Sequence, residues 1–222
     1  MNPSRLPPPR WLTFDCYGTL IDWEAGIRGS FRDLCRVPAD EEEEALRLWE
    51  RIQWEKIQEP YAPYADIMQA SFRETCDQIG YPCATHSEEG FLNSVARWEP
   101  FPDVNPALTA LSLRYKLAII SNIDRELLGR TLRQLKIRFD ALITAEDARC
   151  YKPNPEIFRH ALGKLGCSPQ EIVHVAFGAD YDLGPASSLR FRLVYVNRKQ
   201  LQRPDVPLEA EIKTLDELTG LW

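Results

Sequence analysis

The chain has few of the residues that build metal centres and disulfide frameworks. Its three histidines are dispersed, and its six cysteines form neither a Cys-x-x-Cys pair nor the His/Cys spacing of zinc ligands. No signal-peptide pattern precedes the cysteines, so we expect free thiols in a reducing compartment. The cysteine pattern argues against a zinc site and a disulfide scaffold, and it favours a cytoplasmic protein.

Long apolar runs and an excess of basic charge are missing as well. The longest apolar run, around residues 117–120, is far shorter than the roughly 20 residues that a membrane-spanning helix needs. The chain has 27 Lys and Arg against 33 Asp and Glu, and the basic residues are scattered rather than clustered. A polyanion-binding surface needs such a cluster. We therefore expect a small-molecule partner, and neither a nucleic acid nor a membrane.

The sequence does have enough apolar residues for a sizeable core. With 222 residues, 44% of them hydrophobic, it can form one core or a core domain that carries a smaller inserted one. Four prolines predict an extended tail over residues 1–9. Residues 11–14 then form a short apolar run typical of a buried strand. This strand ends at Asp15, and Gly18 allows a tight turn after it.

Helical and alternating patterns divide the remainder of the chain. Residues 23–99 predict helices at 25–35, 40–58, 64–79 and 87–98, separated by prolines. After Pro100, strands at 115–120, 141–144, 172–176 and 193–196 alternate with helices. Asn105 and Asn154, each followed by proline, are the expected caps of two of these helices. The pattern predicts an α/β fold with a Rossmann-like, doubly wound parallel sheet. Residues 10–22 and 100–222 would form this core, and residues 23–99 a helical insertion.

Several polar residues follow predicted strands, where parallel sheets gather their reactive groups. Asp15 ends the first strand, Ser121 and Asn122 end the next, Lys152 precedes a capped helix, and Asp182 follows the strand at 172–176. Each residue alone has a plain interpretation as a turn, a helix cap or a solvated charge. Together they could converge at one edge of the sheet.

In this order the residues resemble the four sequence motifs of the haloacid dehalogenase (HAD) superfamily. The matches are Asp15-Cys-Tyr-Gly-Thr-Leu, Ser121-Asn122, Lys152-Pro-Asn-Pro and Asp182. The insertion at 23–99 lies where such enzymes carry a cap domain. The resemblance implies a covalent aspartate nucleophile at Asp15, and it implies that the cap takes part in a homodimer.

The chemistry of the matched residues fits that role. A carboxylate becomes an effective nucleophile when a cation and hydrogen-bond donors hold it ionised and aimed. Lys152 is the natural cation, and the donors are Thr19, Ser121 and Asn122. Asp182 would hold Lys152 in place or help to activate the water that hydrolyses the ester.

Two positions separate a dehalogenase from a phosphatase. The phosphatases of this superfamily have a general-acid aspartate two residues after the nucleophile, where this chain has Tyr17. They also have a Mg²⁺-binding aspartate where this chain has Phe177, which cannot bind a hard cation; Asp180 is the substitute left to consider. Tyr17 in this setting is similar to the L-2-haloacid dehalogenases (type II), whose leaving halide needs no proton. The resemblance therefore implies a metal-independent hydrolase of small 2-halo acids, without a cofactor.

The resemblance is incomplete where substrate is bound. Those dehalogenases have an arginine after a Leu-Trp pair in the cap, and here that position is Glu50; we expect Arg47 or Arg51, which share a helix face, to replace it. Phe158, Phe177 and Ala179 stand where the family has polar substrate contacts. The pocket has therefore changed, and Tyr17, Arg47, Arg51 and Phe177 are the predicted substrate-binding residues. Two alternatives stay open: a Mg²⁺-dependent phosphatase, and a catalytically idle binding protein with the HAD fold.

Overall fold

The computed structural model describes residues 7–82 and 86–222, so most of the tail predicted at 1–9 lies outside the described residues. The chain forms two compact units. The first contains the residues up to Ile21 together with Pro100–Ser121 and Leu135–Trp222, and the second contains Asp22–Glu99 and Asn122–Gln134. The sequence interpretation placed residues 122–134 in the core, whereas in the structure they group with the helical insertion. A cap with boundaries at residues 23 and 99 stays a prediction.

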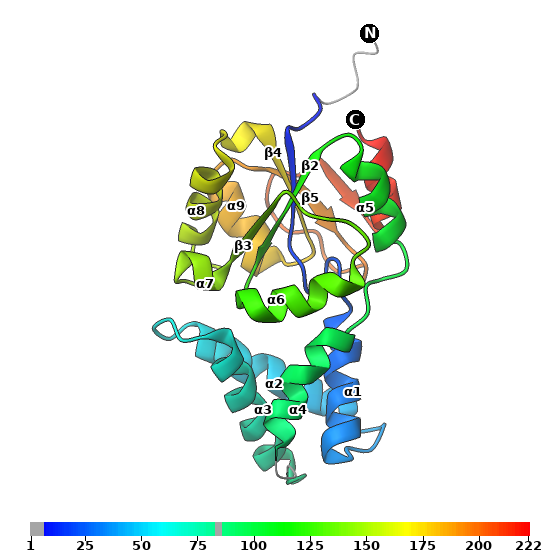
Figure 1. The fold of residues 1–222 in the computed structure, drawn as a ribbon, viewed down its shortest axis with the longest axis vertical. Helices are drawn as coiled ribbons and strands as arrows, with labels where there is room; N and C mark the ends of the chain where they lie inside the picture. The colour runs from blue at the N-terminus through cyan, green and yellow to red at the C-terminus, as the bar shows by residue number, and fades with distance from the viewer. Residues whose placement is uncertain (1–6, 83–85) are drawn as a thin grey trace. The chain divides into compact units, whose positions relative to one another are not determined.

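The first unit is built on a six-stranded sheet in the order β3-β2-β1-β4-β5-β6 (Figure 1). Its strands are β1 (Trp11–Phe14), β2 (Lys116–Ser121), β3 (Ala141–Thr144), β4 (Ile172–Ala176), β5 (Arg192–Val196) and β6 (Ala210–Ile212). All five neighbouring pairs are parallel, which confirms the predicted doubly wound sheet. The strand order reverses between β1 and β4, so a crevice for reactive groups is expected at the carboxyl ends of these two strands.

Helices cover both faces of this sheet. Figure 1 shows α8 and α9 on one side and α5 on the other. The helices of the first unit are α5 (Val104–Ser112), α7 (Ala145–Ala148), α8 (Glu156–Leu165) and α9 (Gly184–Ser188). Because both faces are covered, the central strands β1 and β4 are buried along their whole length.

Helix starts differ from the predicted caps by one or two residues. The N-cap of α5 is Asp103, and the side chain of Asn105 instead accepts a hydrogen bond from the backbone N–H of Lys136 at 2.8 Å. Pro155 is the N-cap of α8, one residue after the predicted Asn154. A polar residue beside a proline marks the region of a helix start but not its register, since the same side chain can bond a neighbouring turn.

The second unit is helical. It contains α1 (Trp23–Cys35), α2 (Glu42–Ile57), α3 (Tyr64–Ile79), α4 (Ser87–Ser94) and α6 (Arg125–Thr131), with 3₁₀ turns at Val95–Arg97 and Leu132–Gln134. Three mutually contacting rings lie in its core: Phe72 stacks on Phe31 and on Phe91 at centroid distances of 5.1 and 4.4 Å, and Phe31 lies 6.3 Å from Phe91.

Asp124 explains why the α6 segment belongs to this unit. Its carboxylate accepts hydrogen bonds from the backbone N–H groups of Tyr64 (3.0 Å) and Ala65 (2.7 Å), the first two residues of α3. Two further contacts join the same segment to α4 and the turn after it: Arg130 donates to Asn93 at 2.9 Å, and Gln134 donates to the carbonyl of Ala96 at 2.7 Å.

The cysteines only partly follow the expectation of free thiols. Cys16, Cys150 and Cys167 are free, whereas Cys76 is disulfide-bonded. Cys35 is a buried thiol whose pKa is raised by burial to about 11, and its Sγ lies 3.2 Å from Sγ of Cys76, too far for a disulfide bond between the two. Sequence spacing does not reveal such proximity, because these residues are brought together by helix packing. Cys83 lies outside the described residues.

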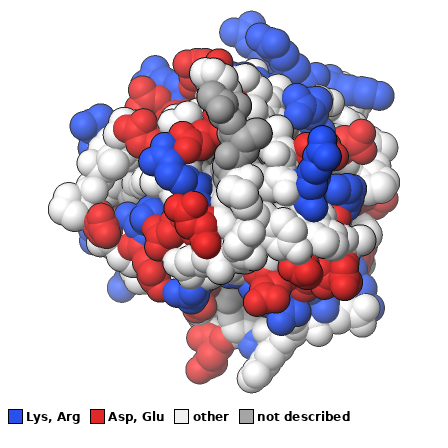
Figure 2. Space-filling model, turned by 90° about the horizontal axis from the view of Figure 1, so that it is seen from below, with Lys and Arg blue, Asp and Glu red and all other residues white. Residues whose placement is uncertain are grey.

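Surface charge and hydropathy give two further findings. On the face seen in Figure 2, Lys and Arg side chains gather at the upper right and elsewhere are interspersed with Asp and Glu. Across residues 7–82 and 86–222, every helix is too short or too polar to cross a membrane.

Candidate active site

Asp15 follows β1 directly, at the point where the strand order reverses. Its backbone N–H donates to the carbonyl of Val175 at 3.1 Å and so continues the ladder between β1 and β4. The chain then turns tightly, because the N–H groups of Leu20 and Ile21 both donate to the carbonyl of Cys16. The Asp15 side chain is buried by this turn and is only 7% exposed. The fold therefore fixes one carboxylate in the crevice of the sheet.

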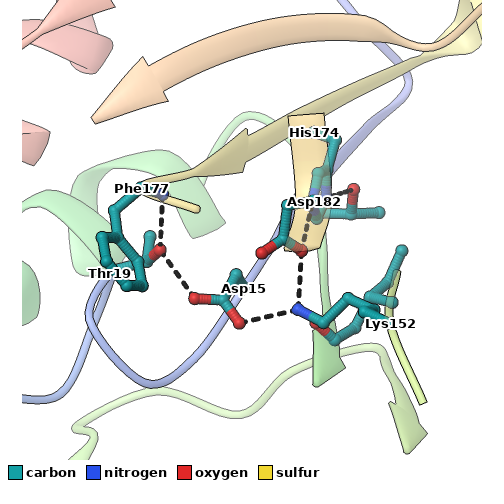
Figure 3. A network of polar contacts seen from close by, with 8 residues as sticks. Asp15, Thr19, Lys152, His174, Phe177 and Asp182 are labelled. Atoms are coloured by element: carbon teal, nitrogen blue, oxygen red, sulfur yellow. Dashed lines mark hydrogen bonds and ion pairs between the residues drawn. The ribbon is translucent and has the colours of Figure 1, made fainter. Parts of the chain in front are cut away.

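Lys152 joins this carboxylate to a second one. Its Nζ donates to Asp15 Oδ1 at 2.8 Å, to Asp182 Oδ1 at 2.6 Å and to the carbonyl of Ile120 at 3.1 Å (Figure 3). The lysine side chain is only 2% exposed. A buried ammonium is stable only when it is paired and hydrogen-bonded, and these three acceptors meet that need.

Thr19 holds the other oxygen of the nucleophile candidate. Its hydroxyl donates to Asp15 Oδ2 at 2.9 Å, and its Oγ1 accepts from the backbone N–H of Phe177 at 3.1 Å. The carbonyl of Thr19 also accepts from the guanidinium of Arg198 at 3.0 Å. Both oxygens of Asp15 are thus engaged by donors, which orients the carboxylate.

Asp182 lies in the π-helical turn Ala179–Leu183 that follows β4, and its side chain is 1% exposed. Oδ1, the oxygen bound by Lys152, is also 3.1 Å from Nε2 of His174. The other ring nitrogen of His174, Nδ1, is 2.9 Å from Oγ1 of Thr13. Figure 3 shows these side chains as one connected network with Asp15.

The three charged groups set one another's pKa. Burial and the nearby Asp182 raise the pKa of Asp15, and together they outweigh Lys152 and Thr19. Burial would also raise the pKa of Asp182, but Lys152 and His174 outweigh burial and lower it. Burial would lower the pKa of Lys152, yet its two carboxylate partners raise it. Lys152 therefore stays charged, and Asp182 ionises before Asp15.

Cys16, beside the nucleophile candidate, is fully buried, and burial raises the pKa of its thiol well above the ordinary value. A buried thiol with a raised pKa is a poor nucleophile. Cys16 is therefore a core residue.

The other predicted site residues of the first unit lie around this network. Ser121 is the last residue of β2 and follows Ile120, whose carbonyl accepts from Lys152. Tyr17 is half-buried and forms a β-bridge with Ile21. Phe177 lies against the turn after Asp15 through its bond to Thr19. The structure thus brings Asp15, Thr19, Lys152 and Asp182 into direct contact and places Ser121, Tyr17 and Phe177 on the adjoining segments.

Three predicted site residues belong to the second unit: Asn122, Arg47 and Arg51. Arg47 pairs with Glu43 at 3.3 Å and Arg51 with Glu55 at 3.4 Å, each one turn away on α2, and the arginine side chains are 74% and 57% exposed. Exposed pairs of this kind are weak, so both arginines can change partner at little cost. Their role toward substrate stays a prediction.

Sequence reasoning missed Thr13 and His174. The available signal was one polar residue in each of two otherwise apolar strands, Trp-Leu-Thr-Phe and Ile-Val-His-Val-Ala. Their partnership becomes visible only with the sheet register, which pairs Thr13 with His174 across β1 and β4.

The donor set around Asp15 does not fit the magnesium site of the phosphatase alternative. The Phe177 side chain supplies no oxygen ligand. Asp180, the residue that could replace it as a ligand, is exposed, whereas Asp182 is buried. Within the described part of the chain, no group of three or more His, Cys, Asp or Glu side chains could hold a metal ion. Mg²⁺ is usually bound through carboxylates and water, and here Lys152 already occupies the space between the two carboxylates.

Comparison with known proteins agrees with this geometry. A family model described as haloacid dehalogenase-like hydrolase matches residues 9–176. The chain belongs to this hydrolase family. The (S)-2-haloacid dehalogenase 4A of Burkholderia cepacia is 30% identical to this chain over 227 residues, which cover 96% of this chain and 94% of that protein.

Comparison with solved structures identifies similar proteins of the same kind. The crystal structure of a dehalogenase superposes with a TM-score of 0.88 at 26% identity, covering 98% of both chains. A dehalogenase structure described as an intermediate complex superposes with a TM-score of 0.86 at 25% identity, covering 96% of both chains. The resemblance inferred from the four motifs is confirmed.

Proposed function

We propose that this hydrolase cleaves the carbon–halogen bond of small 2-halo acids, with Asp15 as covalent nucleophile and without a metal ion. The observation that carries the proposal is the buried Asp15 carboxylate, held by Lys152 at one oxygen and by Thr19 at the other. The second residue after it is Tyr17 rather than an acid that could protonate an alcohol leaving group. The names of the related dehalogenases support the same chemistry.

In the first step, an oxygen of ionised Asp15 attacks the carbon that bears the halogen. The new carbon–oxygen bond forms as the carbon–halogen bond breaks, and the halide leaves with the bonding electron pair. No proton is transferred, so this step requires no general acid. Lys152 and Thr19 keep the carboxylate oriented toward the carbon.

In the second step, water attacks the carboxyl carbon of the Asp15 ester. Asp182 is the carboxylate available to accept a proton from this water, because Asp15 has lost its charge in the ester. The tetrahedral intermediate expels the 2-hydroxy acid, which takes up a proton, and Asp15 is regenerated. One proton per turnover is released to solvent together with the halide.

The carboxylate of the substrate requires cationic or hydrogen-bonding partners. We assign this role to Arg47 or Arg51, with Ser121 and Asn122 as further donors, and we assign an apolar wall to Tyr17 and Phe177. If one arginine binds the substrate carboxylate, replacing it with alanine raises KM much more than it lowers kcat, whereas replacing the other leaves both nearly unchanged.

The test is halide release from (S)- and (R)-2-chloropropionate, in EDTA and in Mg²⁺, with Asp15→Asn as the inactive control. We expect release that is insensitive to EDTA and absent in the variant. Abolition of turnover by EDTA would contradict the metal-free mechanism. Hydrolysis of an aryl phosphate that rises with Mg²⁺ would favour the phosphatase alternative, and silence on both substrate classes would favour an idle binding protein.

An isotope experiment locates the nucleophile. With enzyme in excess over substrate in ¹⁸O-labelled water, the first hydroxy acid released should contain unlabelled oxygen from Asp15. The peptide that contains Asp15 should gain the label. Label in the product and none in the peptide would show that water attacks the substrate directly.

A further inference from the structure

His174 is a buried titratable residue that the steps above do not use. It lies in the middle of β4 with no exposed surface. Its ring contacts three side chains: Nδ1 is 2.9 Å from Thr13 Oγ1, Nε2 is 3.1 Å from Asp182 Oδ1, and the ring of Phe158 meets it edge-on at 5.2 Å. These contacts hold the imidazole in one orientation behind Asp182.

The hydrogen-bond chemistry gives this chain of contacts a direction. An ionised Asp182 can only accept, so Nε2 of His174 donates to it. In a neutral imidazole Nδ1 is then an acceptor, and the Thr13 hydroxyl donates to it. The donors therefore run from Thr13 through His174 to Asp182, and every member of the chain is satisfied.

The position of Asp182 Oδ2 is the second observation. Lys152 and His174 both bind Oδ1, and Oδ2 faces the backbone of Gly178, where a Cβ would stand 2.9 Å from it. Oδ2 thus packs closely against the Gly178 backbone, and a side chain at position 178 would displace the Asp182 carboxylate.

We propose that His174, supported by Thr13, is a positioning residue that fixes the orientation of the Asp182 carboxylate and so enables Asp182 to act on the hydrolytic water. The inference rests on the proposed aspartyl-ester mechanism. It predicts a selective effect, because ester formation depends on Asp15 and Lys152 whereas ester hydrolysis also depends on Asp182. Misplacement of a catalytic group by about 1 Å costs about 10²-fold in rate, and we expect a loss of that order in the second step alone.

The contact between His174 and Asp182 also affects the pKa of Asp182. The titratable groups around it are Lys152 from the segment before α8, Asp15 at the end of β1 and His174 from β4. Burial raises the pKa of Asp182, and Lys152 and His174 lower it. Removing the imidazole therefore raises the pKa of Asp182, so that the acid limb of ester hydrolysis moves to higher pH.

The experiment measures formation and decay of the Asp15 ester by quenched-flow mass spectrometry with (S)-2-chloropropionate over a range of pH. His174→Leu removes the donor to Asp182, and His174→Gln keeps an amide donor near the position of Nε2. Thr144→Ala is the matched control, because it removes the capping hydroxyl of α7, which is not part of the network around Asp15.

We expect the ester to accumulate in His174→Leu, with the acid limb of its decay shifted upward, and we expect His174→Gln to restore much of the decay rate. Thr144→Ala should have wild-type partitioning between the two steps. Equal slowing of both steps in His174→Leu, or partitioning like that of Thr144→Ala, overturns the inference. If His174→Leu does not fold, Thr13→Val provides the same comparison with a smaller effect in the same direction.

A second measurement is independent of turnover. The carboxyl ¹³C resonance of Asp182, assigned with Asp182→Asn, is titrated in the substrate-free protein and in the His174 variants. A higher titration midpoint in His174→Leu supports the inference, and an unchanged midpoint overturns it at any level of turnover. Absence of halide release by the wild-type protein overturns the proposed function instead, so the two failures are distinguishable.

Discussion

The ring of Phe177 lies directly on the backbone of Gly18: a Cβ built at Gly18 would stand 2.2 Å from Cε1 of Phe177. The φ of Gly18 is +95°, a value that side-chain-bearing residues rarely adopt. The backbone N–H of Phe177 also donates to Thr19, the next residue after Gly18. The turn after Asp15 is therefore held by the ring and the backbone N–H of Phe177.

This contact predicts a measurable coupling. Gly18→Ala should destabilise the protein by about 1–3 kcal/mol from overpacking, with about 1–2 kcal/mol more from the positive φ. Adding Phe177→Ala should remove the overpacking cost of Gly18→Ala but not the cost of the positive φ. The double variant should therefore lose less stability than the sum of the losses in the two single variants. Urea unfolding of the single and double variants measures each loss of stability and the coupling energy between the two positions.

Gly163→Ala is the control, because this position in α8 has nothing within 4 Å of a built Cβ. It should be neutral or stabilising by about 0.5–1 kcal/mol. Strict additivity of Gly18→Ala and Phe177→Ala would show that the ring does not restrict this turn.

The second prediction concerns the pH dependence of the nucleophile. In the proposed mechanism Asp15 attacks only when ionised, and its raised pKa places the acid limb of kcat/KM above the range of an ordinary aspartate. Thr19→Val removes a donor that lowers this pKa, so the limb should move to still higher pH. A hydrogen bond to a charged group contributes about 1.5–3 kcal/mol, which corresponds to a loss of about 10- to 100-fold in kcat/KM. Thr19→Ser keeps the hydroxyl and should retain the wild-type profile; a Thr19→Val profile at the wild-type position would count against this hydrogen bond.

The third prediction is the stability cost of removing Lys152. Lys152→Met leaves two buried carboxylates without their cation, and breaking a buried pair in this way costs about 3–5 kcal/mol. Without Lys152 the folded-state pKa of both carboxyls rises above the unfolded value of about 3.9. A group with a raised folded pKa contributes its stability at low pH and loses it as pH rises, so the deficit of the variant should shrink between about pH 7.5 and about pH 5.

Urea unfolding at the two pH values measures this difference. Arg159→Met is the control, because Arg159 and its ion-pair partner Glu156 are 52% and 59% exposed, and such a pair contributes about 0–1 kcal/mol. A deficit of Lys152→Met that does not depend on pH would contradict the pairing of charges inside the site.

The fourth prediction concerns the ion pair of Asp103 and Arg198, whose guanidinium also bonds the carbonyl of Thr19 in the turn after Asp15. Asp103 accepts two hydrogen bonds of 2.9 Å from Arg198 and one of 2.7 Å from the backbone of Leu215, and the guanidinium of Arg198 lies 4.0 Å from the ring centroid of Phe101. Burial would raise the pKa of Asp103, but Arg198 and the Leu215 N–H outweigh burial and lower it. A lowered folded pKa means stability that is present above the unfolded value of about 3.9 and is lost as pH falls through the folded pKa.

Asp103→Asn should therefore cost about 1–3 kcal/mol at neutral pH and progressively less in acid, as measured by urea unfolding. Glu156→Gln breaks an exposed pair with Arg159 and should change stability by less than about 1 kcal/mol at either pH. A cost of Asp103→Asn that persists unchanged below the folded pKa would contradict the role of its charge.

The parts of the fold that could be predicted are those with a local signal. Five apolar runs predicted five strands, and strand ends predicted the placement of Asp15, Lys152 and Asp182. The edge strand β6, Ala-Glu-Ile, carries a charge within three residues and has no such signal. The four-residue helix α7 is likewise too short for periodicity to reveal it.

Long-range partners could not be predicted. Thr13 and His174 are 161 residues apart, and Arg198 and Asp103 are 95 apart. Each of these pairs depends on which strands and loops become neighbours in the sheet, and a single sequence does not encode that register visibly. The grouping of residues 122–134 with the helical insertion had no visible signal for the same reason, because the partners of Asp124 lie 59 and 60 residues earlier in the chain.

The position of Asp124 has a practical consequence for protein engineering. A chimera that exchanges only residues 22–99 with a relative would set the relative's α3 against this chain's own Asp124, whose carboxylate binds the first two N–H groups of the native α3. The exchangeable module consists of two segments, 22–99 and 122–134, and it is joined to the sheet by four peptide crossings rather than two. Swaps of substrate specificity between relatives should therefore transfer both segments together, which also carries Asn122 with the helices.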